Sequence, residues 1–246
     1  MTALKVLGRD RTDFENVEVW RTDLTRIDLD RARAMLSGEE SVRAQRFRLD
    51  VHRHRYSAAR SWLRDVLGET TGIAPGALEF TYGPLGKPLL ARWPAVSFNV
   101  SHSGDEAALA VSWNREVGID IEIVRSDPID PASAATVLSP EEIAMVEQSP
   151  DRDRALLRCW VRKEAYAKAR GGGLDRRLAL QTLTGAAGEA IQPPQFEIFD
   201  VEDHPGVVLS VALAERPARN RRHLDQVTST NSDPKSEIDN RPGEGK

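Results

Sequence analysis

The sequence predicts an α+β fold built from two similar α/β halves. A long helical pattern followed by a pair of strand patterns occurs twice, first in residues 51–113 and again in residues 152–213. Residue identity between the two runs is weak, so the order of elements alone suggests an internal duplication. The chain has 246 residues, of which 40% are hydrophobic and 29% charged, and this balance is typical of a globular protein with ample core.

Charge and cysteine content narrow the class of protein. The net charge of −4 argues against a general polyanion binder, but arginines are dense in residues 43–64 and indicate an anionic partner or a solvated helix face. Cys159 is the only cysteine, so no internal disulfide can form, and we expect it to pack in the core. The sequence has no apolar signal core and no run of membrane-spanning length, so we expect a cytoplasmic location.

The remaining elements follow from periodicity and from turn residues. We expect strands at 17–20, 78–82, 96–100, 107–113, 195–201 and 207–213, and helices at 28–36, from Ser37 onward, at 51–67, 131–138 and 139–148. Ser139 and Glu142 have the spacing of a capping box at the start of the last of these helices. After about residue 215 the composition becomes polar and predicts a disordered tail.

The arginines of the 51–67 helix fall into two groups. Arg53, Arg60 and Arg64 lie opposite its apolar face, and we expect them in solvent. Arg55 falls within the apolar face, where a guanidinium needs an anion. That anion is either a core carboxylate or a ligand phosphate, and the sequence favours neither.

The strand predicted at residues 117–123 carries acidic side chains on one face. Apolar residues alternate there with Gly118, Asp120 and Glu122. Residues two apart in a strand project to the same face, so Asp120 and Glu122 place two carboxylates side by side. Such a pair suits a hard cation such as Mg²⁺, although the solvated face of an amphipathic strand has the same pattern.

A helix predicted over residues 152–170, followed by three glycines, adds a third carboxylate. Glu164 falls in a stripe that is otherwise largely apolar, where an unpaired carboxylate is costly. One explanation is a private i,i+4 ion pair with Lys168. The other is a three-carboxylate metal site that Glu164 forms with Asp120 and Glu122.

Six short motifs follow one another along the chain. They are Arg43 with Arg46-Phe47, Arg55-Tyr56, Gly86-Lys87-Pro88, Phe98-Asn99-Val100-Ser101-His102-Ser103, Gly118-Ile119-Asp120-Ile121-Glu122, and Trp160 through Lys163-Glu164 to Lys168. Together and in this order they resemble the Sfp-type phosphopantetheinyl transferases of the holo-carrier-protein synthase superfamily. We expect residues 101–104 to form a loop whose backbone N–H groups can face an anion.

The resemblance implies a pseudo-two-fold arrangement of the two α/β halves, with coenzyme A in the cleft between them. It implies Mg²⁺-dependent transfer of phosphopantetheine to a serine of an apo acyl or peptidyl carrier protein, with release of adenosine 3′,5′-bisphosphate. Such carriers serve polyketide, nonribosomal peptide or fatty acid biosynthesis. The expected partners are the carrier and coenzyme A, with no nucleic acid and no membrane, and the expected state is a monomer.

The resemblance also assigns parts of the chain and single residues. Residues 1–115 would form the coenzyme side, 116–216 the Mg²⁺ and catalytic side, and 217–246 the polar tail. Asp120, Glu122 and Glu164 would bind Mg²⁺, and Glu164 and Lys168 would be catalytic, with Lys168 at the pyrophosphate. The residues expected to bind coenzyme A are Arg43 and His102 at the 3′-phosphate, with Arg55, Tyr56, Lys87 and Ser101. Many relatives carry a basic residue in place of Glu40, so fewer cations would remain for the 3′-phosphate.

Two other functions are compatible with the same residues. A Mg²⁺-dependent transferase or hydrolase of a nucleotide diphosphate would use the same carboxylates, but the chain has no Walker-type glycine loop. A degenerate carrier-binding module would lack metal-dependent binding of coenzyme A, and Glu40 is the one residue that suggests it.

Overall fold

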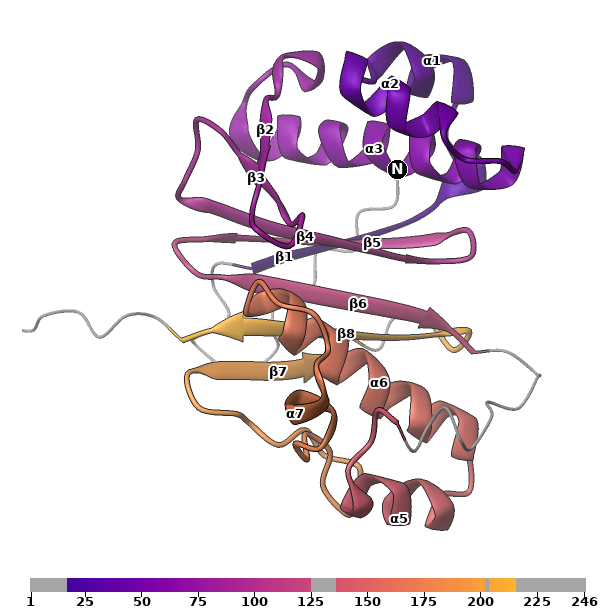
Figure 1. The fold of residues 1–246 in the computed structure, drawn as a ribbon, viewed down its shortest axis with the longest axis vertical. Helices are drawn as coiled ribbons and strands as arrows, with labels where there is room; N and C mark the ends of the chain where they lie inside the picture. Colours follow the sequence, from indigo (N-terminus) through magenta and orange to yellow (C-terminus); the bar gives the residue numbers. More distant parts are fainter. Residues whose placement is uncertain (1–16, 125–135, 202–203, 216–246) are drawn as a thin grey trace, which may run out of the picture. The chain divides into compact units, whose positions relative to one another are not determined.

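A computed structural model describes residues 17–124, 136–201 and 204–215. Both helices and strands occur throughout this part of the chain (Figure 1), which confirms the predicted α+β class. The helices are α1 (Leu29–Met35), α2 (Gly38–Gln45), α3 (Asp50–Thr71), α5 (Pro140–Gln148), α6 (Arg152–Ala169) and α7 (Arg176–Ala179), with 3₁₀ turns η1 (Leu24–Arg26) and η2 (Pro75–Ala77). The strands are β1 (Val17–Asp23), β2 (Phe80–Tyr82), β3 (Pro88–Leu90), β4 (Val96–Ser103), β5 (Glu106–Trp113), β6 (Val117–Ile123), β7 (Phe196–Asp200) and β8 (Val207–Ala214).

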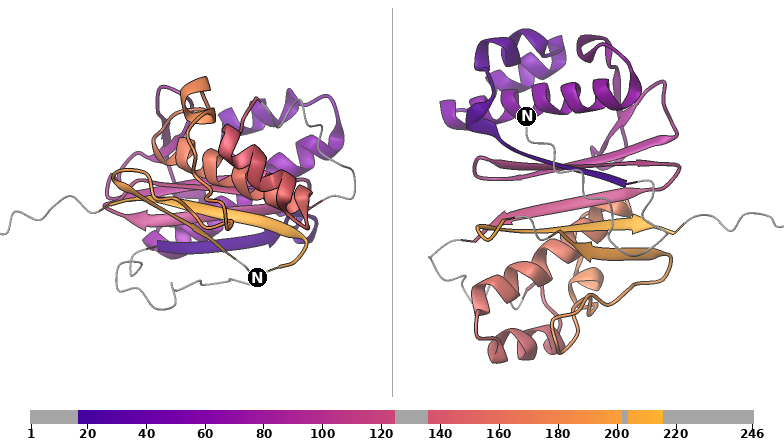
Figure 2. Two further views of the ribbon diagram at one scale, coloured as in Figure 1. Left: turned by 90° about the horizontal axis from the view of Figure 1, so that it is seen from below. Right: turned by 180° about the vertical axis from the view of Figure 1, so that it is seen from behind.

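Two antiparallel three-stranded sheets share one topology. The first has the order β1-β5-β4 and the second β6-β8-β7, while β2 and β3 form a separate hairpin. In each sheet a first strand is followed along the chain by a long helix and two further strands, and the last strand lies in the middle. The predicted repeat of a long helix and a strand pair is therefore confirmed. The strands lie between the α1–α3 group and the α5–α6 group (Figures 1 and 2).

Apolar packing joins each long helix to its sheet and joins the sheets to each other. Leu63 of α3 packs with Phe98 and Leu109 of the first sheet, and all three are fully buried. Between the sheets, β6 contributes Ile119 to a second core, which also contains residues of β1, β5 and β8. Each such side chain contributes about 1.5–3 kcal/mol to stability when fully buried, so the packing of the two sheets against each other is strongly stabilised.

Helix α6 lies directly against β6 at Gly118. A Cβ atom added to Gly118 would stand 2.1 Å from the carbonyl oxygen of Ala165 and 2.4 Å from the backbone nitrogen of Ala169. No side chain fits at those distances, so glycine is required there for the close approach of strand and helix. This approach brings Glu164 and Lys168 of α6 to the strand that carries Asp120.

Several sequence predictions are confirmed element by element. Strand β6 has the predicted bounds, and the side chains of Ser139 and Glu142 form the predicted capping box of α5. Cys159 is buried, and burial raises the pKa of its thiol to about 11. Most of the helix expected at 131–138 and the whole tail expected at 217–246 lie outside the described residues. In the part of the chain that is described, no helix is both long and apolar enough to cross a membrane.

The expected loop at Ser101-His102-Ser103 is instead the end of β4. These residues pair with β5 as far as Ser103 opposite Glu106, and the chain reverses at Gly104, whose φ is +56°. Their polar side chains resemble a loop in sequence, but Ser101 and Ser103 donate hydrogen bonds to the carboxylates of Asp120 and Glu122. The polar end of β4 therefore faces the acidic strand.

The prediction that Arg60 and Arg64 are solvated is wrong. Both are buried because Glu40 of α2, which is only 3% exposed, accepts hydrogen bonds from both guanidinium groups. Burial alone would raise the pKa of Glu40, but the charge of Arg60, the backbone N–H of Ser37 and the charge of Arg64 together lower it. The three residues form the Glu40 cluster, which ties α2 to α3.

We expect Glu40→Gln to reduce stability in a pH-dependent way. At pH 7 the loss should be about 3 kcal/mol, because two buried guanidinium groups lose their counter-ion. The folded-state pKa of Glu40 is lowered, so its contribution is present above the ordinary glutamate pKa and is lost as the pH falls below it. Urea unfolding should therefore show a gap between parent and variant that narrows below about pH 4.

The matched control is Glu39→Gln, because Glu39 is the exposed neighbour of Glu40 in the first turn of α2. This variant should change the unfolding free energy little at either pH. A gap for Glu40→Gln that stays constant from pH 7 to pH 3 would contradict the assigned role of its charge.

Candidate active site

A cavity of about 530 Å³ is lined by residues of both sheets and both long helices. On one side are Asp120 and Glu122 of β6 with Glu164 and Lys168 of α6. On the other side the lining includes Arg43 of α2 and residues of α3, β2 and β4. The acidic strand, the third carboxylate and part of the arginine-rich segment predicted from sequence thus meet at one cavity.

Asp120 is hydrogen-bonded to both Lys168 and Ser101 in the cavity. Its Oδ1 accepts hydrogen bonds from Lys168 Nζ at 2.6 Å and from Ser101 Oγ at 2.7 Å. Lys168 Nζ also donates to Ser101 Oγ at 3.0 Å and to the carbonyl oxygen of Ile119 at 3.3 Å. The other oxygen, Oδ2, is buried and has no hydrogen-bond partner among the described residues, so one strong acceptor is left for a ligand.

Glu164 does not form the private pair with Lys168 that its spacing allows. Lys168 bonds to Asp120 instead, and the side chain of Glu164 makes no hydrogen bond to any described residue. Burial raises the pKa of Glu164; the charge of Lys168 opposes that shift, and the charges of Asp120 and Glu122 add to it. The three carboxylates are therefore close enough to repel one another.

These carboxylates have the chemistry of a site for a hard cation. Among the described residues, no three acidic, histidine or cysteine side chains are gathered closely enough to hold a metal ion as they stand. However, Asp120 Oδ2 is buried without a partner, and the mutual repulsion of three carboxylates is relieved by a cation. Such oxygen ligands suit Mg²⁺, and we judge that the residues present fit it.

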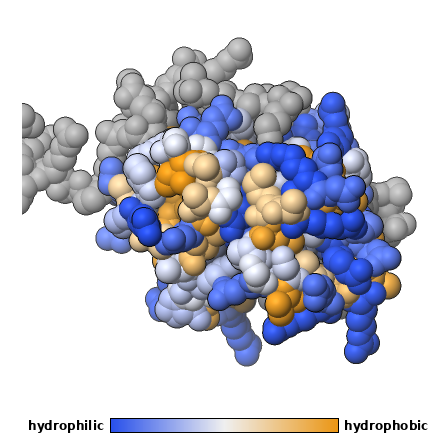
Figure 3. All heavy atoms as spheres, turned by 90° about the horizontal axis from the view of Figure 1, so that it is seen from above, coloured by the Kyte–Doolittle hydropathy of each residue, from blue (hydrophilic) through white to orange (hydrophobic). Residues whose placement is uncertain are grey.

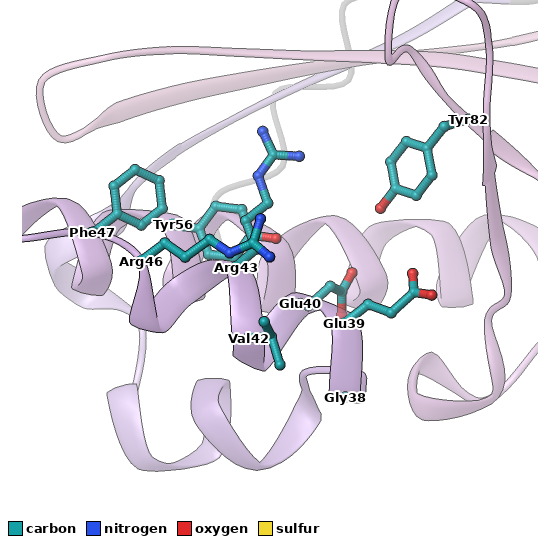
Figure 4. Close-up of a pocket in the computed structure, with 9 residues that line it drawn as sticks. All are labelled: Gly38, Glu39, Glu40, Val42, Arg43, Arg46, Phe47, Tyr56 and Tyr82. Atoms are coloured by element: carbon teal, nitrogen blue, oxygen red, sulfur yellow. The ribbon is translucent and has the colours of Figure 1, made fainter.

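Four of the six residues expected to bind coenzyme A line the cavity. They are Arg43, Tyr56, Ser101 and His102. The guanidinium of Arg43 lies over the ring of Tyr56, 5.7 Å from its centroid. A second, larger cavity of about 960 Å³ adjoins here, because Arg43, Tyr56 and Tyr82 line both (Figure 4).

Arg55 and Lys87, the other two residues expected to bind coenzyme A, pair with carboxylates of the protein. Arg55 forms a bidentate ion pair with Asp105, with Nε 2.7 Å and Nη2 3.0 Å from its carboxylate oxygens. Lys87 Nζ lies 2.8 Å from Glu116 Oε2 and 3.1 Å from the carbonyl oxygen of Val117. Neither residue lines the cavity, because carboxylates outside it engage both side chains. Arg55 thus has a protein carboxylate as its partner.

Sequence reasoning did not assign Arg60 and Tyr82 to the cavity that they line. A signal for Arg60 was present, since it follows Tyr56 by four residues and therefore lies on the same face of α3. Tyr82 had no such signal, because it reaches the cavity through the β2–β3 hairpin, whose position depends on tertiary packing.

The cavity brings together a lysine–carboxylate pair, further carboxylates and an arginine, which are side chains of the kind that bind phosphate groups and metal ions. Residues 19–114 match the family described as 4′-phosphopantetheinyl transferase, N-terminal, and residues 116–224 match the 4′-phosphopantetheinyl transferase superfamily. The chain is 34% identical over 209 residues to the 4′-phosphopantetheinyl transferase HetI of Nostoc sp., covering 81% of this chain and 88% of that one. The chain therefore belongs to the 4′-phosphopantetheinyl transferase superfamily and is a transferase.

Two further similarities cover less of the molecule. The 4′-phosphopantetheinyl transferase of Bacillus subtilis is 31% identical over 148 residues, which are 59% of this chain and 65% of that one. The crystal structure of holo-acyl-carrier-protein synthase from Neisseria meningitidis aligns with a TM-score of 0.34 at 23% identity, covering 41% of this chain and 97% of that one. A score this low adds nothing to the argument.

Proposed function

We propose that this protein transfers the phosphopantetheine moiety of coenzyme A to a serine of an apo acyl or peptidyl carrier protein, with Mg²⁺, and releases adenosine 3′,5′-bisphosphate. The family supports the transfer. The observation that carries the finer proposal is the contact of Lys168 with Asp120 Oδ1 while Oδ2 stays buried and unpaired. A cation and an available acidic oxygen thus stand together where a pyrophosphate and its metal ion would bind.

The residues divide between the two ends of the coenzyme. Lys168 holds positive charge for the pyrophosphate, and Arg43 and His102 serve the 3′-phosphate at the side of the cavity toward α2 and β4. Asp120, Glu122 and Glu164 would hold Mg²⁺, which when bound supplies positive charge to the phosphoryl oxygens. Tyr56 and Ser101 also line the cavity, and Ser101 donates to Asp120 beside Lys168.

The reaction requires one bond to form, one to break and one proton to move. The carrier serine oxygen bonds to the β-phosphorus, and the bond from that phosphorus to the bridging oxygen breaks. The leaving group is adenosine 3′,5′-bisphosphate, whose developing negative charge Lys168 stabilises. Glu164 accepts the serine proton, directly or through a water molecule.

The test is incubation of the protein with coenzyme A, Mg²⁺ and a panel of apo carriers, followed by intact-mass measurement. At least one carrier should gain the mass of phosphopantetheine, and adenosine 3′,5′-bisphosphate should appear in equal amount. Removal of divalent metal with a chelator should reduce the rate by on the order of 10²-fold or more, and added Mg²⁺ should restore it.

Two results would contradict this proposal. Release of nucleotide without any carrier would indicate a hydrolase acting on a nucleotide diphosphate. Carrier binding without transfer, and without metal-dependent binding of coenzyme A, would indicate a carrier-binding module.

A further inference from the structure

The Glu40 cluster contains two arginines that share one carboxylate unequally. Glu40 Oε2 accepts from Arg64 Nε and Nη2, and Arg64 Nη1 donates to the carbonyl oxygens of Pro75 and Leu78 at 3.0 Å. Every guanidinium nitrogen of Arg64 is therefore bonded. Arg60 donates to Glu40 Oε1 through Nε at 2.7 Å and through Nη2, whereas its Nη1 has no acceptor among the described residues.

The unpaired nitrogen belongs to the arginine that lines the active-site cavity. Arg60 is 9% exposed and is part of the cavity wall, whereas Arg64 is 3% exposed and is not. Arg60 Nη1 has no partner among the described residues and is not fully buried, so a ligand in the cavity can contact it. A largely buried guanidinium that lines a cavity and has one donor without a partner is a suitable contact for an anion.

The charges of the cluster require such an anion. Two guanidinium groups and one carboxylate carry a net charge of +1 in a largely buried setting. A buried excess charge is costly unless it has a counter-ion, and the protein supplies no second carboxylate to these arginines among the described residues. The ring of Phe80 packs 4.6 Å from the Arg60 guanidinium carbon and holds it in place, but a ring does not neutralise it.

Arg60 acts on the same part of the cavity as Arg43. The charges of both arginines influence the hydroxyl of Tyr56, whose pKa burial raises and these two charges lower. Glu164 and Lys168, in contrast, enter the cavity from α6. Figure 4 shows Arg43 and Glu40 coming from α2 toward Tyr56 of α3. Two arginines and a tyrosine hydroxyl are thus gathered where α2 and α3 form the cavity wall.

We propose that Arg60, held in position by Glu40, binds the 3′-phosphate of coenzyme A together with Arg43, and so selects coenzyme A over its 3′-dephospho form. This inference rests on the proposed function. It also gives Glu40 a supporting role in coenzyme binding. Its carboxylate is bonded to two arginines, so it does not repel the phosphate, and it holds Arg60 at the cavity.

The test compares ligands that differ only in the 3′-phosphate. Calorimetry with adenosine 3′,5′-bisphosphate and with adenosine 5′-monophosphate should show that Arg60→Gln weakens binding of the bisphosphate about tenfold and leaves the monophosphate nearly unchanged. In the transfer assay, the same variant should raise KM for coenzyme A and not for 3′-dephospho-coenzyme A, with kcat little changed.

The matched control is Arg64→Gln, one helical turn further along α3. It removes an arginine from the same carboxylate, so it should lower the melting temperature at least as much, yet it should leave the preference between the two nucleotides unchanged. If Arg60→Gln folds poorly, Arg60→Lys keeps the ion pair with Glu40 but has no second nitrogen in the position of Nη1, because its single ammonium nitrogen is held at the carboxylate. It should show the same selective loss.

The outcomes separate this inference from the proposed function. An equal loss for both nucleotides, or no loss for either, overturns the inference while binding and transfer by the parent protein leave the proposed function intact. A parent protein that binds both nucleotides equally also overturns it. A parent protein that binds neither nucleotide and modifies no carrier overturns both.

Discussion

Replacing Asp120 with asparagine should lower the rate of phosphopantetheine transfer by on the order of 10³-fold in a protein that still folds. The substitution keeps the shape of the side chain, so the amide oxygen can still accept from Lys168 and Ser101, which now bond to Oδ1. The amide nitrogen then takes the place of the buried, unpaired Oδ2 and carries no negative charge. The variant therefore lacks the acceptor proposed for Mg²⁺. Stability should change little, because one of three mutually repelling carboxylates is lost and Lys168 can reach water.

The assay for this prediction has two parts. Single-turnover transfer with saturating coenzyme A and carrier gives the loss in the chemical step, and calorimetry with and without Mg²⁺ gives the loss of metal-dependent binding. Asp65→Asn is the control, since it removes a carboxylate of α3 that pairs with Arg31 outside the cavity. Full activity in a folded Asp120→Asn protein would remove Asp120 from the metal site.

The sequence predicts best where the structure depends on local periodicity. Strand β6 keeps its predicted bounds because alternation identifies a strand whose apolar face is buried against a second sheet. The capping box of α5 and the long helix α6 follow from similarly local signals. These elements carry all three carboxylates and Lys168, so the acidic side of the site was predictable from the chain alone.

The sequence does not predict the ion-pair partner of a side chain when that partner lies in another helix, strand or turn. The spacing offers Lys168 a partner four residues away in Glu164, but the structure gives it Asp120, 48 residues away, at 2.6 Å. Arg60 and Arg64 look solvated by helical periodicity, yet Glu40 reaches them from another helix. For Arg55 the sequence left the anion open, and the structure pairs it with Asp105 in the turn after β4. Periodicity describes one element at a time, so it cannot identify a counter-ion supplied by another.

The exposed hydrophobic residues of the N-terminal helices are a further case in which helical periodicity does not predict burial. Figure 3 looks onto the face formed by α1, α2 and α3, where hydrophilic side chains surround separate small hydrophobic areas. Val42, Leu49 and Val51 are among the exposed large hydrophobic residues of this region, at 45–59% exposure. Val51 begins the helix expected at 51–67, and in the structure it lies exposed in the first turn of α3. The periodic pattern therefore extends beyond the part of the helix that the core covers.

Replacing Gly118 with alanine should destabilise the protein by about 3 kcal/mol and reduce transfer in parallel, because one methyl group would force α6 away from β6. The added Cβ would stand 2.1 Å from the Ala165 carbonyl oxygen and 2.4 Å from the Ala169 nitrogen, and both obstacles are backbone atoms that cannot rotate aside. Moving α6 would carry Glu164 and Lys168 away from Asp120, so the Lys168–Asp120 contact should lengthen even in molecules that fold.

Urea unfolding and single-turnover transfer on the same preparation separate the two effects of Gly118→Ala. The loss of rate should exceed the fraction of unfolded protein, because the site is distorted in the folded molecules as well. Gly76→Ala is the control, because Gly76 lies in η2 with nothing within 4 Å of an added Cβ. The unfolding free energy of this variant should differ from that of the parent by less than about 1 kcal/mol. If Gly118→Ala were as stable and as active as the parent, α6 would not approach β6 as closely as described. The positions of Glu164 and Lys168 beside Asp120 would then need another cause.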